Sequence, residues 1–309
     1  MKITVASPTY GRAWSLPYML EGLLSQSRPP DEVIIVLKPS GDGSEEVLRR
    51  YEGRLPLRVL MQRSGGVVQA VQMAIDAATG DLILFIDDDA VPEERWIEKY
   101  ERFFEEVPDA GGASGLAAVA HLMNGRPEPT GEIAGETYRN SPSGVPWKRP
   151  LPELDDYCDY ISISGLLAKA TCSGLSAHYK SIALWGMNMA FRADAIAGAP
   201  LGKLYEGSRK GLHNESVLAY IAVRRGYSTY RIVDREESPM VMHIEGPSLT
   251  RQSGFFHEFW LHYDRVKMYH RLRTLRANVS LAAYAAACLV TTRKHVLPRA
   301  LATIYAQMR

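Results

Sequence analysis

Short apolar segments alternate with segments of helical spacing through the first hundred residues, and this rhythm constrains the fold most. The runs at 32–37 and 81–86 (Glu-Val-Ile-Ile-Val-Leu and Asp-Leu-Ile-Leu-Phe-Ile) are almost wholly apolar, which is typical of strands buried on both faces. Strand and helix in alternation predict βαβ units and a mostly parallel α/β sheet flanked by helices. The predicted strands are 2–6, 32–37, 57–61 and 81–86, and the predicted helices are 16–25, 67–78, 93–107 and one that starts at Ser44.

The second half of the chain gives weaker signals. Residues 124–152 contain six prolines and several glycines, so we expect a long irregular loop there. Further strands are predicted at 187–191, 227–233 and 240–244, a helix at 214–225, and a helical region after Phe255. We therefore expect a catalytic domain at 1–254, with halves at 1–122 and 123–254, and a helical C-terminal extension at 255–309.

The balance of charge differs between the two ends of the chain. The 309 residues carry a formal charge of +1, which argues against a protein that coats nucleic acid. Residues 265–309 hold nine basic side chains and no acidic one, so this segment carries +9 and residues 1–264 carry −8. A basic helical extension suits an anionic membrane surface. Docking onto the acidic body of the same subunit, or of a second subunit in a homo-oligomer, is an equal alternative.

The cysteine pattern and the N-terminus indicate a compartment. The three cysteines are widely spaced and contain no CxxC pair, so no disulfide framework is expected. The chain opens on a strand-like segment, Met-Lys-Ile-Thr-Val-Ala-Ser. Its longest apolar run is near 279–290, and even the uncharged stretch around it, 277–292, is shorter than the ~20 residues of a membrane-spanning helix. These features favour a cytoplasmic protein, with membrane association on the cytoplasmic face left open.

The strongest chemical signal is Asp87-Asp88-Asp89, directly after a buried strand. Ligands of open α/β sheets bind beyond the carboxyl ends of the strands. Three adjacent carboxylates raise one another's pKa values unless a cation lies among them, and a hard divalent cation would satisfy them while bridging to substrate phosphates. A solvated acidic loop or a helix cap is the alternative interpretation.

Four segments together resemble the family-2 glycosyltransferases, whose fold is the nucleotide-sugar-binding GT-A fold. The resemblance covers residues 2–246 and depends on the order and spacing of the segments. They are Ser-Pro-Thr-Tyr-Gly-Arg at 7–12, Leu-Leu-Ser-Gln-Ser-Arg-Pro-Pro-Asp-Glu-Val-Ile-Ile-Val at 23–36, Ala-Thr-Gly-Asp-Leu-Ile-Leu-Phe-Ile-Asp-Asp-Asp-Ala at 78–90, and Trp-Gly-Met-Asn-Met-Ala-Phe-Arg at 185–192. The resemblance implies a GT-A, Rossmann-like sheet and a nucleotide-sugar donor.

The resemblance also implies roles around the donor. An Asp-x-Asp segment of this kind holds the donor ribose and a Mn²⁺ or Mg²⁺ ion, which maps to Asp87 and Asp89, with Asp88 beside the nucleotide. His243 would complete the metal site, although a lone histidine is often structural. The remaining donor-side residues implied are Pro8, Thr9, Tyr10, Arg12, Lys38, Gln72 and Arg251.

Glu215 occupies the place where the family carries its catalytic Asp, and Asn214 occupies the place of the preceding Glu. A carboxylate in the first turn of a helix stays ionised and can accept a proton. Glu215 is therefore the expected base, and support of the helix start is its alternative role. Trp185, Gly186, Asn188 and Asn214 are expected at the sugar and acceptor pocket.

Two departures leave the donor base unassigned. Lys38 stands where uridine-using members carry an acidic residue, and Ala-Val-Gln at 70–72 replaces the frequent Ala-Arg-Asn. The expected function is metal-dependent, inverting transfer of a sugar from a UDP-, GDP- or dTDP-sugar to a hydroxyl of a glycan or lipid-linked acceptor. A sugar-1-phosphate nucleotidyltransferase and a non-catalytic carbohydrate- or partner-binding protein are the alternatives.

Overall fold

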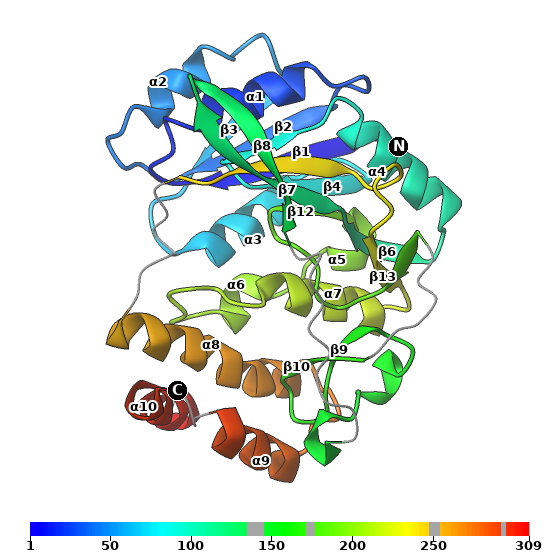
Figure 1. Ribbon diagram of the computed structural model, residues 1–309, viewed down its shortest axis with the longest axis vertical. Helices are drawn as coiled ribbons and strands as arrows, with labels where there is room; N and C mark the ends of the chain where they lie inside the picture. The colour runs from blue at the N-terminus through cyan, green and yellow to red at the C-terminus, as the bar shows by residue number, and fades with distance from the viewer. Residues whose placement is uncertain (135–144, 171–176, 247–253, 292–294, 309) are drawn as a thin grey trace.

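The computed structural model describes residues 1–134, 145–170, 177–246, 254–291 and 295–308, and its centre is an eight-stranded sheet (Figure 1). The strand order is β11-β13-β6-β12-β4-β1-β2-β3. β12 runs antiparallel to β4 and β6, and β11 runs antiparallel to β13, while the other pairs are parallel. The strands are β1 Ile3–Thr9, β2 Glu32–Leu37, β3 Leu57–Met61, β4 Leu82–Ile86, β6 Ala110–Ser114, β11 His178–Lys180, β12 Asn188–Arg192 and β13 Ser228–Ile232.

Two smaller sheets accompany the central one. A four-stranded sheet has the order β5-β14-β7-β8, and a two-stranded sheet pairs β9 with β10. Their strands are β5 Ala90–Pro92, β7 Leu116–Met123, β8 Arg126–Ala134, β9 Asp159–Ile161, β10 Leu167–Lys169 and β14 Met240–Ile244. β5 follows β4 almost directly, so the four-stranded sheet begins at the carboxyl end of the central sheet.

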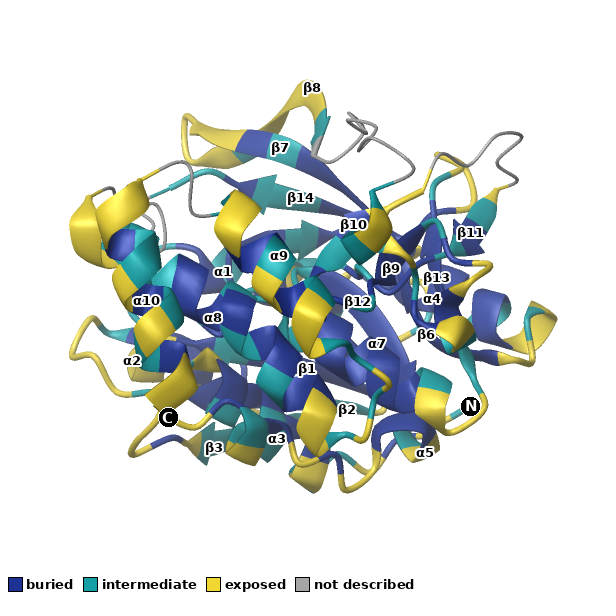
Figure 2. Cartoon of the chain, turned by 90° about the horizontal axis from the view of Figure 1, so that it is seen from below, coloured by how far each residue is buried: buried dark blue, intermediate teal, exposed yellow. Residues whose placement is uncertain are grey.

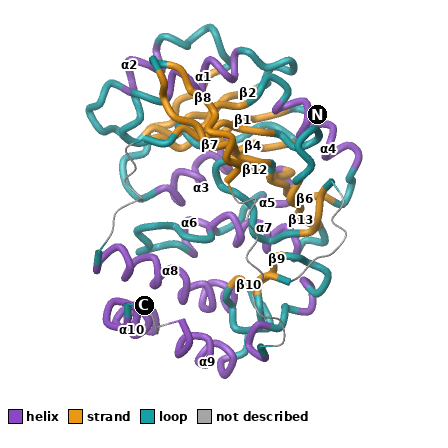
Figure 3. Tube along the Cα trace, viewed as in Figure 1, coloured by secondary structure: helices purple, strands orange, loops and turns teal. Residues whose placement is uncertain are grey.

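Helices cover both faces of the central sheet, as the alternating pattern predicts (Figure 3). α1, α2 and α4 lie on one face, and α3, α5, α6 and α7 on the other, with α8 to α10 beyond them. Their bounds are α1 Leu16–Leu24, α2 Ser44–Arg49, α3 Val67–Ala77, α4 Trp96–Glu106, α5 Ala193–Ile196, α6 Leu201–Leu204, α7 Asn214–Arg224, α8 Phe255–Thr274, α9 Leu281–Thr291 and α10 Val296–Met308, with 3-10 turns η1 Pro146–Lys148 and η2 Pro152–Leu154.

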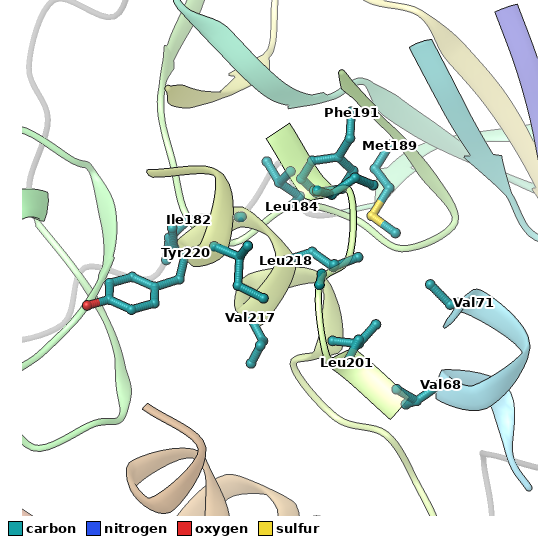
Figure 4. Close-up of a cluster of buried hydrophobic side chains, with 14 of the residues drawn as sticks. Val68, Val71, Ile182, Leu184, Met189, Phe191, Leu201, Val217, Leu218 and Tyr220 are labelled. Atoms are coloured by element: carbon teal, nitrogen blue, oxygen red, sulfur yellow. The ribbon is translucent and has the colours of Figure 1, made fainter. Parts of the chain in front are cut away.

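The continuous apolar runs serve two cores at once. Along β4, Leu82, Leu84 and Ile86 pack in the core beneath α1 and α4, whereas Ile83 and Phe85 pack in the core with α3 and α7. Side chains alternate between the faces of a strand, so a strand covered by helices on both faces needs apolar residues throughout. Figure 4 shows part of the second core, where side chains of α3, α6, α7 and β12 meet.

The C-terminal extension docks on the body of the protein. Met268 and Leu272 of α8 are buried in the core beside α7. The opposite side of α8 packs on α9 and α10 in a third cluster that includes Tyr263, Val266 and Tyr284. The docking alternative is therefore observed for α8, because this helix is shared between two cores.

Two expectations need correction. The segment 124–152 is not wholly irregular, because β8 pairs with β7; β8 is an edge strand, where prolines are tolerated. Cys158 is disulfide-bonded, against the expectation of no disulfide framework, while Cys288 is a free, buried thiol. Within the described ranges, no helix combines the length and the apolar character needed to cross a bilayer.

Candidate active site

Three neighbouring parallel strands end at one edge of the central sheet and bring the candidate donor residues together. β1 lies between β2 and β4, with Thr9 level with Leu37 and Ala6 level with Phe85. Tyr10, Lys38 and Asp87 follow directly. The cavity at this edge, called the donor cavity below, has a volume of about 500 Å³. It is lined by Pro8, Thr9, Tyr10, Arg12, Lys38, Gln62, Gly66, Val67, Ala70, Asp87, Asp88, Asp89, Met187, His243, Ile244 and Gly246.

The pairing of β14 with β5 places His243 against the acidic turn. His243 is level with Ala90 in this antiparallel pair, one residue past Asp89. His243 Nε2 lies 3.2 Å from Asp89 Oδ1. One ligand atom from each of Asp87, Asp89 and His243 falls within 4.8 Å of the other two. Two carboxylates and one imidazole form a donor set that suits Mn²⁺, and Mg²⁺ accepts the carboxylates.

Arg12 supplies positive charge to the same carboxylates. Its Nε lies 3.3 Å from Asp88 Oδ1 and its Nη2 lies 3.1 Å from Asp89 Oδ2. Burial nevertheless raises the pKa of Asp88 to about 7, and burial with the neighbouring charge of Asp89 raises the pKa of Asp87. The acidic turn therefore holds more negative charge than Arg12 compensates, and a divalent cation fits this excess.

Lys38 lines the cavity beside Tyr10. Its ammonium group donates a hydrogen bond of 2.8 Å to the carbonyl of Gly65 and lies 5.4 Å from the centre of the Tyr10 ring. Gln62 lies nearby and donates a hydrogen bond of 2.9 Å to the carbonyl of Gly66. Sequence reasoning missed Gln62, although its place directly after β3 matches that of Lys38 after β2.

Glu215 lies in the first turn of α7, after a sharp turn in the chain. His213 adopts φ +66°, and the side chain of Asn214 donates a hydrogen bond of 2.9 Å to the carbonyl of Gly211. Burial raises the pKa of Glu215 to about 7, and the charge of Asp87 contributes to the rise. Glu215 does not line the donor cavity, but its carboxyl group lies within electrostatic reach of the acidic turn.

Helix α8 holds the loop that leads to Glu215. Asp264 Oδ2 accepts hydrogen bonds from Ser208 Oγ at 2.8 Å and from the backbone N–H of Leu212 at 3.2 Å. Its other oxygen accepts from Arg271 Nη2 at 2.7 Å, and both residues are fully buried. Arg271 also donates to the carbonyl of Leu204 at 3.0 Å. A buried ion pair from the extension thus fixes the segment between α6 and α7.

The N-terminal part of the chain matches a known protein family. Residues 4–119 match the model of glycosyl transferase family 2. This segment belongs to that family. It contains the whole acidic turn and the donor-side residues up to Asp89, whereas His243 and Glu215 lie outside it, so the family match does not cover them.

Curated proteins similar to this segment are named as glycosyltransferases. A glucosyl-dolichyl phosphate glucuronosyltransferase of Haloferax volcanii is 33% identical over 122 residues, which are 37% of this chain and 38% of the relative. The teichuronic acid biosynthesis glycosyltransferase TuaG of Bacillus subtilis, whose name is marked as putative, is 30% identical over 121 residues, 38% of this chain and 48% of the relative. The chain thus spans less than half the length of these relatives.

Solved structures share the fold over nearly the whole chain. The mannosyltransferase PcManGT from Pyrobaculum calidifontis, in complex with GDP-Man and Mn²⁺, has a TM-score of 0.55 at 16% identity and covers 99% of this chain and 75% of its own. GalNAc-T7 with UDP, GalNAc and Mn²⁺ has a TM-score of 0.61 at 11% identity over 95% of this chain and 58% of its own. The GT-A fold expected from the sequence is confirmed.

Two site residues expected from the family resemblance have other roles here. Asn188 is fully buried and uses its whole amide group inside the protein: its oxygen accepts from Trp96 and Tyr100, and its nitrogen donates to the carbonyls of Leu116 and Pro239. It therefore joins α4 to three strand ends and cannot face an acceptor. Gln72 bonds to Asp76 and to the backbone of Gly202, which links α3 to α6 away from the donor cavity.

The remaining expected residues are Trp185, Gly186 and Arg251. Trp185 packs under the guanidinium of Arg231, 4.8 Å from the ring centre. The space around Gly186 is open, since a Cβ there would meet no atom within 4 Å. Neither residue lines the donor cavity, although Met187 beside them does. Arg251 lies outside the described residues.

Proposed function

We propose that the chain is a metal-dependent, inverting glycosyltransferase that uses a nucleotide-sugar donor. The observation that carries the proposal is the meeting of Asp87, Asp89 and His243 at the mouth of a cavity of about 500 Å³ beyond the carboxyl ends of β1, β2 and β4. A nucleotide has a flat base, a ribose and a diphosphate, and the cavity offers an aromatic ring and an ammonium group, those of Tyr10 and Lys38, together with the acidic turn. Its family 2 relatives and nucleotide-bound fold neighbours support this assignment.

In the proposed complex the protein holds the donor at three points. Tyr10 and Lys38 contact the base, and Asp88 accepts a hydrogen bond from the ribose. Asp87, Asp89 and His243 hold Mn²⁺ or Mg²⁺, which would neutralise the negative charge that develops on the departing diphosphate. Arg12 already bonds to Asp88 and Asp89 and is placed to contact a phosphate oxygen beside them.

Glu215 serves as the base in this proposal. The acceptor hydroxyl gives its proton to the Glu215 carboxylate while the hydroxyl oxygen forms a bond to the anomeric carbon. The bond between that carbon and the diphosphate oxygen breaks in the same step, and the configuration inverts. A pKa near 7 keeps the carboxylate basic enough to take the proton at neutral pH.

The acceptor is proposed to be a hydroxyl of a glycan or of a lipid-linked sugar, reached from the side of Gly186 and Met187. The outer helices support peripheral contact with an anionic membrane on the cytoplasmic face. Six large apolar residues of α9 and α10 are more than half exposed: Leu281, Leu289, Val296, Leu297, Ile304 and Met308. Figure 2 views the molecule from this side and shows the exposed surface of both helices.

Two matched variants test the catalytic proposal. Glu215→Gln should keep Mn²⁺-dependent nucleotide binding and lose transfer, because only the base is removed. Asp89→Asn should lose both. The released product should be a nucleoside diphosphate. Pyrophosphate as the product, or full turnover by Glu215→Gln, would contradict the assignment.

A further inference from the structure

A second cavity lies where the C-terminal extension meets the body. It has a volume of about 420 Å³ and shares no lining residue with the donor cavity. Its walls come from η1, from the turn between β9 and β10, and from α8 to α10. Its lining includes Trp147, Lys148, Ser164, Arg265, Val290 and Arg299.

Positive charge dominates this cavity. Lys148, Arg265 and Arg299 line it, and none of the described lining residues is acidic. Arg299 is paired, because its guanidinium bonds to Glu258 Oε2 at 3.0 Å. Glu258, which pairs with Arg299, also acts on Arg265 through its charge, as Arg299 does.

Arg265 is the unusual member. It is partly buried, and among the residues that the structure describes it has neither a hydrogen-bond nor an ion-pair partner. Burial lowers the pKa of Arg265, and the charge of Arg299 lowers it further. A partly desolvated guanidinium without a partner costs stability unless a ligand satisfies it. Its five N–H donors suit the oxygens of a phosphate group.

The surroundings of the cavity are apolar. Trp147, Leu166, Leu167 and Val290 form part of its wall. Beside Val290, Leu289 is 75% exposed, and Leu297, two residues before Arg299, is 63% exposed. A basic cavity bordered by exposed apolar side chains matches a molecule with a phosphate group and an apolar body, rather than a free phosphate or a soluble sugar phosphate.

We propose that this cavity binds the phosphate group of an anionic lipid, with Arg265 as its principal ligand, and that the apolar side chains of α9 and α10 enter the lipid surface around it. The site lies outside the proposed catalytic site. The proposal rests on the membrane contact proposed above and names the lipid group that the protein binds there. Arg265 has no partner among the described residues, which leaves its guanidinium to the lipid headgroup.

Vesicle co-sedimentation of the full chain tests the site. The vesicles are pure phosphatidylcholine or an equal mixture of phosphatidylcholine and phosphatidylglycerol. The variant is Arg265→Gln, and the matched control is Arg273→Gln, which removes an exposed arginine from the same helix away from the cavity. We expect Arg265→Gln to bind the mixed vesicles about tenfold more weakly, the order of effect of one hydrogen bond to a charged group, and the control to change binding less than about twofold.

Two further measurements separate the outcomes. Arg265→Gln should melt no lower than the wild type, since it loses no protein partner; a lower melting temperature would indicate a structural role and overturn the proposal. Equal losses in both variants would mean a diffuse charge effect and no site. Absence of vesicle binding, together with Arg265-dependent stabilisation by glycerol phosphate, would assign the cavity to a soluble phosphate instead. Mn²⁺-dependent nucleotide binding, measured in parallel, reports on the catalytic proposal independently.

Discussion

At the scale of the residue, the site is governed by carboxyl groups in places that disfavour their charge. Glu215 is the clearest case, because burial is the main cause of its raised pKa and the charge of Asp87 adds to it. A carboxylate with a raised pKa accepts a proton more readily, which gives a physical reason for the sequence-based assignment of Glu215 as the base. The same environment links activity and stability to pH.

Transfer should rise with pH as Glu215 ionises. The midpoint of kcat/KM is expected near pH 7 and lower at saturating metal, because a bound cation offsets the charge of Asp87. The measurement is a pH–rate profile of the wild type at two Mn²⁺ concentrations. A flat profile between pH 5 and 8 would contradict the role of Glu215 as the base.

Stability should respond in the opposite direction. The folded-state pKa of Glu215, about 7, lies above its unfolded value of 4.5, so the folded state binds the extra proton between these values and is destabilised as pH rises through them. Glu215→Gln should therefore melt a few degrees above the wild type at pH 8, with little difference at pH 4. Thermal melts in metal-free buffer check this, and a difference independent of pH would contradict it.

A variant of Asn188 distinguishes a structural role of this residue from a role in binding the acceptor substrate. Asn188→Ala removes the acceptor of the Trp96 indole N–H and one donor each from the carbonyls of Leu116 and Pro239, so we expect a loss of about 2–4 kcal/mol in the free energy of unfolding. Nucleotide affinity of the folded fraction should stay within about twofold of the wild type. Unchanged stability with a raised KM for the acceptor would restore the role expected from the sequence.

At the scale of the element, apolar patterning accounts for the strands that were predicted, and close packing accounts for those that were missed. β2 and β4 are continuous apolar runs and were predictable. β6 reads Ala-Gly-Gly-Ala-Ser and is not, because its glycines are required by neighbours: a Cβ on Gly112 would lie 2.6 Å from the Phe191 ring. Such a requirement depends on a residue far along the chain and leaves no local signal.

Some residues of the candidate site were likewise predictable from local sequence, and others were not. The acidic turn and the residues after β1 and β2 were predictable, because parallel strands share one carboxyl edge. His243 depended on the family resemblance, and the register of β14 against β5 supplies its physical reason. The displacement of Asn188 and Gln72 from the site was not predictable, since their partners on other elements appear only in the fold.

The Asp264–Arg271 pair should be the most sensitive polar contact of the extension. Asp264→Asn leaves Arg271 buried without its counter-charge, and we expect a loss of about 3–5 kcal/mol. The matched control is Glu258→Gln, which breaks the more exposed pair with Arg299 and should cost less than about 1 kcal/mol. Urea denaturation of both variants tests this, and equal losses would contradict it.

At the scale of the whole molecule, the extension is part of the fold as well as the candidate membrane face. The net charge of +9 over 265–309 suggests a separate basic segment, yet Arg271 is buried against Asp264 and Met268 fills the core. Removal of 255–309 should therefore give insoluble or unfolded protein. A soluble fragment 1–254 that binds nucleotide with Mn²⁺ would contradict this.

The central claim is that Asp87, Asp89 and His243 hold a cation that binds a nucleotide. Calorimetric titration of UDP, GDP and dTDP into the wild type and Asp89→Asn, with and without Mn²⁺, tests it most directly. The account predicts that at least one nucleotide binds the wild type in a Mn²⁺-dependent manner and that Asp89→Asn weakens this binding about tenfold or more. Binding that is independent of Mn²⁺ and unchanged in Asp89→Asn, or no binding by any of the three, would contradict it.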